Sequence, residues 1–154
     1  MSINLEQCPF CQIAQNQAHS YTIWEDENYQ AFLSIYPNTA GTTIVIPKEH
    51  LSSDVLSLTT DEIGSFMVAI KAVSEILKEK LNDVGRVGLI FDGFGVNHAH
   101  AKLYPMHGTK MSSWKPIRSH LDTYFTQYVG YISSHDYHGV SDDTLAKIHQ
   151  QLTN

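Results

Sequence analysis

Two strand-like segments, residues 86–91 and 97–105, are separated only by the turn Asp92-Gly93-Phe94-Gly95 and one valine. Parallel neighbouring strands need a crossover of about a dozen residues or more, usually a helix. No helix fits between these two segments, so they must form an antiparallel hairpin. This short connection excludes a parallel βαβ unit at this point and favours an antiparallel sheet.

The second strand of this hairpin alternates strictly between small apolar and polar side chains, which predicts one buried face and one working face. The apolar set is Ala99, Ala101 and Leu103, and the polar set is His98, His100 and Lys102. Two imidazoles and an ammonium gain little from burial in an ordinary core. We therefore expect a functional surface here, with a polar strand face that merely carries histidines as the simpler alternative.

One long amphipathic helix is predicted over residues 60–82. Thr59 and Glu62 fit a capping box at its start, because each side chain can satisfy a free amide of the first turn. Apolar residues then recur at helical spacing and predict a stripe that packs on the sheet. They are Ile63, Phe66, Met67, Ile70, Val73, Leu77 and Leu81.

The remaining strands lie before this helix. Residues 21–25 and 29–34 fit a hairpin around a turn-prone Asp-Glu-Asn, and residues 42–46 are apolar enough for a central strand. A short helix is predicted to follow Cys8. The expected fold class is α+β: an antiparallel five-stranded sheet with one long helix packed on it and a shorter N-terminal helix.

The chain after Pro105 gives weaker patterns. Residues 106–117 look irregular, and residues 120–131 fit either a helix or, in their later part, a strand. Ser141 fits the N-cap of a terminal helix over residues 142–152, which carries acidic residues in its first turn.

The length of 154 residues suits a single domain, with a core at about residues 8–116 and a C-terminal extension at 117–154. The net charge of −6 argues against a nucleic-acid partner, because affinity for the phosphate backbone depends on clustered Lys and Arg. No apolar run could span a bilayer, and no signal-peptide pattern opens the chain. We therefore expect a cytoplasmic protein with no membrane partner.

Cys8 and Cys11 are the two cysteines of the chain, in a Cys-x-x-Cys arrangement. In a reducing compartment, metal binding or redox chemistry is the better explanation than a structural disulfide. The spacing suits two thiolate ligands of one zinc ion, which is only half a site. A thioredoxin-like redox pair is the alternative, although no strand precedes the pair to place it in a βαβ unit.

Taken in order, these features resemble the histidine-triad superfamily of nucleotide hydrolases and nucleotidyl transferases. The resemblance covers about residues 8–114. Its parts are Cys8-x-x-Cys11, a glycine loop, Ile-Val-Ile-Pro-Lys-Glu-His50, one long helix and His98-x-His100-x-Lys102. The segment Met-Ser-Ser-Trp114-Lys-Pro is similar to the Met and Trp-Pro region that follows in the family.

The resemblance implies that His100 attacks an α-phosphate and forms a covalent nucleotidyl-histidine, which water or another acceptor then resolves. Imidazole suits this role as a neutral nucleophile at pH 7. The implied protein is a nucleotide phosphohydrolase or nucleotidyl transferase, with a dinucleoside polyphosphate hydrolase as one form. A nucleotide-binding or sensing protein with weakened catalysis is the alternative, and a homodimer is expected by analogy.

In the zinc-containing branches of the family, two cysteines, an upstream histidine and the first histidine of the motif bind a structural zinc ion. The matching residues here are Cys8, Cys11, His50 and His98. Such a closed shell would join the N-terminal segment to the catalytic strand without activating water.

The chain departs from the family pattern at three positions. Lys102 replaces the third histidine, and it can supply positive charge to a phosphate but is a poor proton shuttle near neutral pH. Ser34 stands where the family has an aspartate that binds the ribose hydroxyls, and Phe94 stands near a phosphate-contacting glutamine. The expected site residues are catalytic His100 and Lys102 and substrate-binding Ser34, Asn97 and Trp114, with Asp92 as a further polar candidate.

Overall fold

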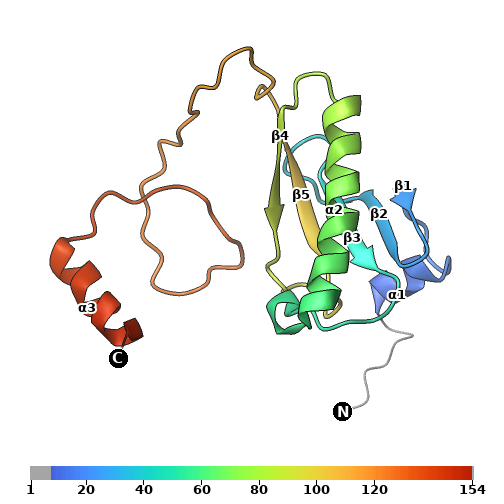
Figure 1. Ribbon diagram of the computed structural model, residues 1–154, viewed down its shortest axis with the longest axis horizontal. Coiled ribbons are helices and arrows are strands. Elements are labelled where there is room, and N and C mark those ends of the chain that lie inside the picture. Colours follow the sequence, from blue (N-terminus) through green and yellow to red (C-terminus); the bar gives the residue numbers. More distant parts are fainter. Residues whose placement is uncertain (1–7, 154) are drawn as a thin grey trace. The chain divides into compact units, whose positions relative to one another are not determined.

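The computed structural model of the protein describes residues 8–153 (Figure 1). Contacts divide the chain into two compact units, one ending at Ser113 and one beginning at Trp114. This boundary lies close to the predicted junction between the core and the C-terminal extension. The whole sheet and the long helix belong to the first unit.

The first unit has the predicted α+β architecture. Its strands are β1 (Thr22–Glu25), β2 (Tyr29–Leu33), β3 (Thr43–Pro47), β4 (Arg86–Ile90) and β5 (Ala101–Met106), and its helices are α1 (Pro9–Ala14), the 3-10 turn η2 (Val55–Ser57) and α2 (Thr60–Lys80). The strands form one antiparallel sheet in the order β1-β2-β3-β5-β4. β3 therefore lies at the centre and β4 at one edge.

The hairpin predicted from the short turn is present as β4 and β5, with Leu89 opposite Leu103 and Ile90 opposite Lys102. β5 begins at Ala101, so the strand prediction was wrong for residues 97–100. Ahead of β5, the backbone N–H of Ala99 donates to the carbonyl of Leu51 at 3.0 Å. This bond to the loop after β3 draws the histidine segment out of the regular ladder.

The two faces of the sheet are covered by different helices. α2, green in Figure 1, covers the face whose core includes Ala31, Val45, Ala101 and Leu103. α1 covers the other face, where Phe32, Ile44 and Ile46 pack against Phe10, Ile13 and Ala14. Lys102 lies opposite Ile44 in the β3–β5 pairing, so it belongs to the α1 face.

The capping box at the start of α2 is confirmed. The backbone N–H of Glu62 donates to the Thr59 hydroxyl at 3.3 Å, and that of Thr59 donates to the Glu62 carboxylate at 2.8 Å. The buried residues of α2 are Phe66, Ala69, Ile70, Val73 and Leu77. Met67 was predicted in this stripe but is 40% exposed, because it lies at the margin of the face that meets the sheet.

The second unit contains α3 (Asp142–Thr153), and the Ser141 hydroxyl accepts from the N–H of Thr144 at 3.3 Å as an N-cap. Residues 120–131 form neither a helix nor a strand, so that prediction was wrong. Their aromatic side chains instead contact other rings of an irregular segment, as between Phe125 and Tyr131. Within residues 8–153, no helix is both long enough and apolar enough to cross a membrane.

Candidate active site

Four potential metal ligands converge at one end of the sheet. Cys8 precedes α1 and Cys11 lies in its first turn, whereas His50 follows β3 and His98 precedes β5. Their ligand atoms all lie within 4.8 Å of one another. The fold therefore brings the complete predicted ligand set together from three separate stretches of the chain.

The spacing within this cluster fits tetrahedral coordination. Cys11 Sγ lies 3.2 Å from His50 Nδ1 and 3.5 Å from His98 Nδ1. Cys8 Sγ lies 3.5 Å from the same nitrogen of His98. Zinc–sulfur bonds of about 2.3 Å and zinc–nitrogen bonds of about 2.0 Å separate neighbouring tetrahedral ligands by roughly 3.5 Å. The side chains are thus spaced as ligands of one ion.

His98 is held in the form that binds a metal. Its Nε2–H donates to the carbonyl of Pro47 at 2.8 Å, which leaves the lone pair of Nδ1 facing the thiols. Burial lowers the pKa of His98 to about 4, although the bond to Pro47 opposes this shift. A neutral imidazole oriented by a backbone carbonyl is the usual arrangement of a metal-bound histidine.

The cysteines need a nearby cation to become ligands. Burial, followed by the hydrogen bond and the charge of Cys8, raises the pKa of Cys11 to about 11. The thiolate is the ligand form, and a divalent cation supplies the positive charge that favours it. Nε2 of His50 is also buried without a hydrogen-bond partner among the described groups. The donor set therefore fits a metal ion.

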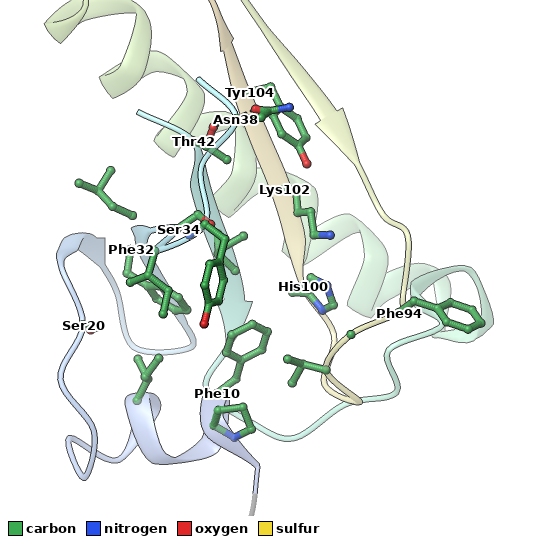
Figure 2. A pocket seen from close by; sticks show the side chains of 18 of the residues that line it. Phe10, Ser20, Phe32, Ser34, Asn38, Thr42, Phe94, His100, Lys102 and Tyr104 are labelled. Carbon is green, nitrogen blue, oxygen red and sulfur yellow. Dashed lines mark hydrogen bonds between the residues drawn. The ribbon is translucent and has the colours of Figure 1, made fainter. Parts of the chain in front are cut away.

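A pocket of about 440 Å³ opens on the α1 face of the sheet, within the size range of small-molecule sites. Figure 2 shows Phe10 and Phe32 on one side and His100 and Lys102 on the other. The apolar wall includes Phe10, Ile13, Phe32 and Ile44. The polar side chains include Ser34, Asn38, Thr42, His100, Lys102 and Tyr104.

Nε2 of His100 lies on the side of Asp92. Its Nδ1–H donates to the carbonyl of His98 at 2.7 Å, which leaves the lone pair on Nε2. The ring is only 3% exposed, and Phe10 packs edge-on against it with centroids 5.4 Å apart. The imidazole is therefore held in one tautomer and one orientation, as a nucleophile requires.

Asp92, which follows β4, connects the two predicted catalytic residues. Its Oδ2 accepts a hydrogen bond from Lys102 Nζ, and its Oδ1 lies 3.4 Å from His100 Nε2. That second oxygen is buried and has no hydrogen-bond donor among the described groups. From the sequence alone, Asp92 was only a further polar candidate. The sequence did give one sign of this contact, because Asp92 lies in the turn of the hairpin whose second strand carries Lys102.

Of the three predicted substrate-binding residues, Ser34 lines the pocket, and Asn97 and Trp114 are not among its lining residues. The Ser34 hydroxyl accepts from the N–H of Tyr36 at 3.1 Å. Asn97 instead accepts a hydrogen bond from Ser53 at 3.2 Å. Trp114 begins the second unit and is exposed, so its role stays a prediction. Phe10 was missed, because its position between two cysteines gives no sign that it contacts both histidines.

Comparison with known proteins agrees with this geometry. The family model described as the HIT domain matches residues 15–108, which is more than half of the chain. The protein named hit from Bacillus subtilis is 29% identical over 133 residues, covering 84% of this chain and 91% of that protein. The matched region of the family model contains His50, His98 and His100.

Solved structures agree as well. A Streptococcus mutans protein has a TM-score of 0.66 at 25% identity, covering 99% of this chain and 87% of that one. A HIT family hydrolase from Clostridium thermocellum has a TM-score of 0.57 at 26% identity, covering 71% and 96%. The match of the family model, the five-stranded fold and the histidine motif lead to one conclusion: the chain belongs to the HIT domain family.

Proposed function

We propose that this protein cleaves a nucleotide at its α-phosphate, or transfers the nucleotidyl group, through a covalent bond between phosphorus and His100 Nε2. The observation that carries the proposal is the bond from Nδ1–H to the His98 carbonyl, which leaves Nε2 as the free nucleophile. The Clostridium thermocellum relative described as a hydrolase supports hydrolysis as the reaction class.

The proposed first step forms a bond from Nε2 to phosphorus and breaks the bond from phosphorus to the leaving oxygen, which keeps the electron pair. Lys102 supplies positive charge to the phosphate oxygens. In the second step, the oxygen of water or another acceptor bonds to phosphorus, and the nitrogen–phosphorus bond breaks. The acceptor's proton passes to solvent, and His100 returns as a neutral imidazole.

Different parts of the pocket lining suit different parts of a nucleotide. The apolar wall formed by Ile13, Phe32 and Ile44 suits a base, and His100 and Lys102 suit the phosphates. The Ser34 hydroxyl would contact the ribose. It makes a weaker contact than a carboxylate, because a carboxylate forms charge-assisted bonds to both hydroxyls.

We propose zinc as the ion of the four-residue cluster, in a structural role. With two thiolates and two imidazoles its shell is closed, so the ion holds residues together and carries no reacting water. Around it, α1 carries Pro9, Phe10 and Ile13 into the wall of the pocket. The cluster thereby links the N-terminal segment to the orientation of His100.

A cytoplasmic homodimer is the proposed state. The reduced Cys8 and Cys11 fit a reducing compartment. β4 is the last strand in the sheet order, and Met67, Val68 and Leu89 expose apolar surface between it and α2. Light scattering should show a dimer in the wild type and a shift toward monomer in Leu89→Lys. A monomeric wild type would reject this part of the proposal.

Trapping of the intermediate tests the proposed reaction. Full-length protein is incubated with nucleotides and dinucleoside polyphosphates labelled at the α-phosphate, quenched, and assayed for acid-labile label on protein. We expect label on wild type and on His107→Ala, a control histidine outside the pocket, and none on His100→Ala. Thermal stabilisation by nucleotides without label or product would support the binding or sensing alternative instead.

A further inference from the structure

We propose that the ion pair between Asp92 and Lys102 restricts this site to leaving groups that depart as stable anions without first taking up a proton. Phosphoanhydrides would then be substrates, whereas phosphoramidates and alkyl phosphate esters would be poor ones. The inference rests on the proposed nucleotidyl-histidine reaction and specifies its substrate class. It is carried by the contacts of Asp92 with both His100 and Lys102.

The pair is built into the hairpin. Lys102 is the second residue of β5 and lies opposite Ile90, the last residue of β4, so Asp92 lies two residues beyond the end of the adjoining strand. The Asp92 side chain is only 8% exposed and that of Lys102 is 28% exposed. Gly93 adopts a φ of +66°, and a Cβ there would lie 2.7 Å from the carbonyl oxygen of Ser53. The turn therefore packs closely against the loop that carries Ser53, immediately after Asp92.

The charges explain why the two residues belong together. A buried carboxylate beside His100 would repel an incoming phosphate, and an unpaired buried charge is itself unfavourable. The Lys102 ammonium cancels this charge, so the pair presents no net negative charge to the substrate. Once the phosphorus–nitrogen bond forms, the ring keeps its Nδ1 proton and is cationic. Asp92 Oδ1, 3.4 Å from Nε2, then lies close enough to stabilise that charge.

This arrangement supplies positive charge to the leaving group, but its proton is only weakly acidic. An amine or alkoxide leaving group needs a proton as its bond to phosphorus breaks, and an imidazole that titrates near neutral pH can provide one. An ammonium paired with a carboxylate is a weaker acid than an imidazolium, so its main effect is to stabilise negative charge. A phosphate leaving group needs only this, because it departs with its electron pair as a stable anion. The Asp92–Lys102 pair thus matches a phosphoanhydride.

The experiment compares two substrates that share the same nucleoside 5′-phosphoryl group. One is a symmetrical dinucleoside tetraphosphate, and the other is the nucleoside 5′-phosphoramidate, each with adenine, guanine, cytosine or uracil. We expect kcat/KM of the metal-loaded wild type to favour the anhydride by about 100-fold or more, the scale of one general-acid contribution. In Lys102→His this ratio should fall by roughly 10-fold or more, since histidine restores a proton donor.

Asp92→Asn provides the second variant, because it keeps the shape of the side chain and removes its charge. Because Asp92 acts by positioning its two neighbours, Asp92→Asn should lower kcat for the anhydride by roughly 10-fold and change KM less. A pair that only joins the two strands would lower activity on both substrates by the same factor. Lys48→Met is the matched control: Lys48 is 30% exposed and lies 3.2 Å from Glu25, and we expect its loss to leave the ratio unchanged.

The outcomes separate this inference from the proposed function. Equal kcat/KM on both substrates, or a preference for the phosphoramidate, with label still found on His100, would overturn the leaving-group restriction alone. Failure of both substrates to label His100 would overturn the proposed reaction and this inference with it. An unchanged ratio in both Lys102→His and Asp92→Asn, each folded by circular dichroism, would assign the wild-type preference to other residues and reject the role of the pair.

Discussion

His98 and His100 are separated by a single alanine and are both buried, yet each is held in the opposite tautomer. His98 donates through Nε2 to the carbonyl of Pro47, which leaves Nδ1 facing Cys8 and Cys11. His100 donates through Nδ1 to the carbonyl of His98, which leaves Nε2 on the side of Asp92. Nδ1 of one histidine therefore faces two thiols, whereas Nε2 of the other faces a carboxylate.

A backbone carbonyl thus determines which ring nitrogen of each histidine donates a hydrogen bond and which one faces other groups. The acceptor for His100 lies two residues away in the sequence, whereas the acceptor for His98 comes from the end of β3. The surroundings differ in the same way. Two thiols lie beside His98, and the Asp92–Lys102 ion pair lies beside His100. Neither difference is visible in the alternating pattern that the two residues share.

Replacing each of these two histidines by alanine should produce the largest effects. His100→Ala removes the nucleophile, so we expect activity to fall by about 10⁴-fold or more while the bound metal and thermal stability are kept. His98→Ala removes a metal ligand, so metal content should fall together with thermal stability. Turnover assays and metal analysis of both variants provide the measurement. Normal metal content in His98→Ala, or retained turnover in His100→Ala, would contradict the assignment.

Removing the metal should be the next largest effect. Chelation or Cys11→Ser should lower the melting temperature by about 10 °C, because a closed metal site stabilises the folded state by several kcal/mol. Phe10 contacts both His98 and His100, so KM should rise as the pocket wall loosens. Differential scanning calorimetry and kinetics measure both effects. Zinc should restore the chelated protein, and magnesium, which prefers oxygen ligands, should not.

The metal-free protein should show its own pH profile of stability. The pKa of His98 is lowered from 6.5 to about 4 on folding, so the unfolded state binds more protons between these values. Stability should therefore be lost as pH falls through this window. The pKa of Cys11 is raised from 9.0 to about 11, so stability should also be lost as pH rises from 9 to 11.

Urea unfolding of the chelated protein from pH 4 to 11 measures this profile. His98→Asn should flatten the acidic limb, and Cys11→Ser should flatten the alkaline limb. A profile that is unchanged by both substitutions would show that other groups govern the pH dependence.

A third histidine, His107, differs from both, and its replacement should have the smallest effect on stability. Nδ1 of His107 bonds to Asp83 at 3.0 Å and Nε2 donates to the carbonyl of Ala40 at 2.8 Å, so neither nitrogen is free to bind a metal or attack a phosphate. The Ala40 carbonyl, followed by Asp83, raises the pKa of His107. This contribution to stability should be present at low pH and lost as pH rises through the raised pKa.

The test is His107→Gln at two pH values. We expect the melting temperature to fall by about 1–2 °C at pH 6 and hardly at all at pH 9, because the ion pair is exposed to solvent. Metal content and turnover should match the wild type at both pH values. A loss of metal or activity would show that His107 contributes to one of the two sites.

Much of the fold follows from patterns between near neighbours in the sequence. The short turn before Val96 correctly predicted an antiparallel hairpin, and Thr59 and Glu62 correctly predicted the start of α2. The same reasoning failed at residues 97–100, where a bond between Ala99 and Leu51 replaces the strand ladder. It also failed at residues 120–131, where aromatic spacing fits several structures and excludes none.

The sequence by itself determined which side chains were available: the Cys-x-x-Cys pair, His50 and the alternating histidines. Only the tertiary structure decided what each one does. The tautomers of His98 and His100, the contact of Phe10 with both rings and the pairing of Asp92 with Lys102 all depend on the groups brought beside them. Periodicity in the sequence predicts which side chains lie on the same face of a strand or helix. Protonation and charge depend instead on the carbonyls, thiols and carboxylates that folding places within a few ångströms.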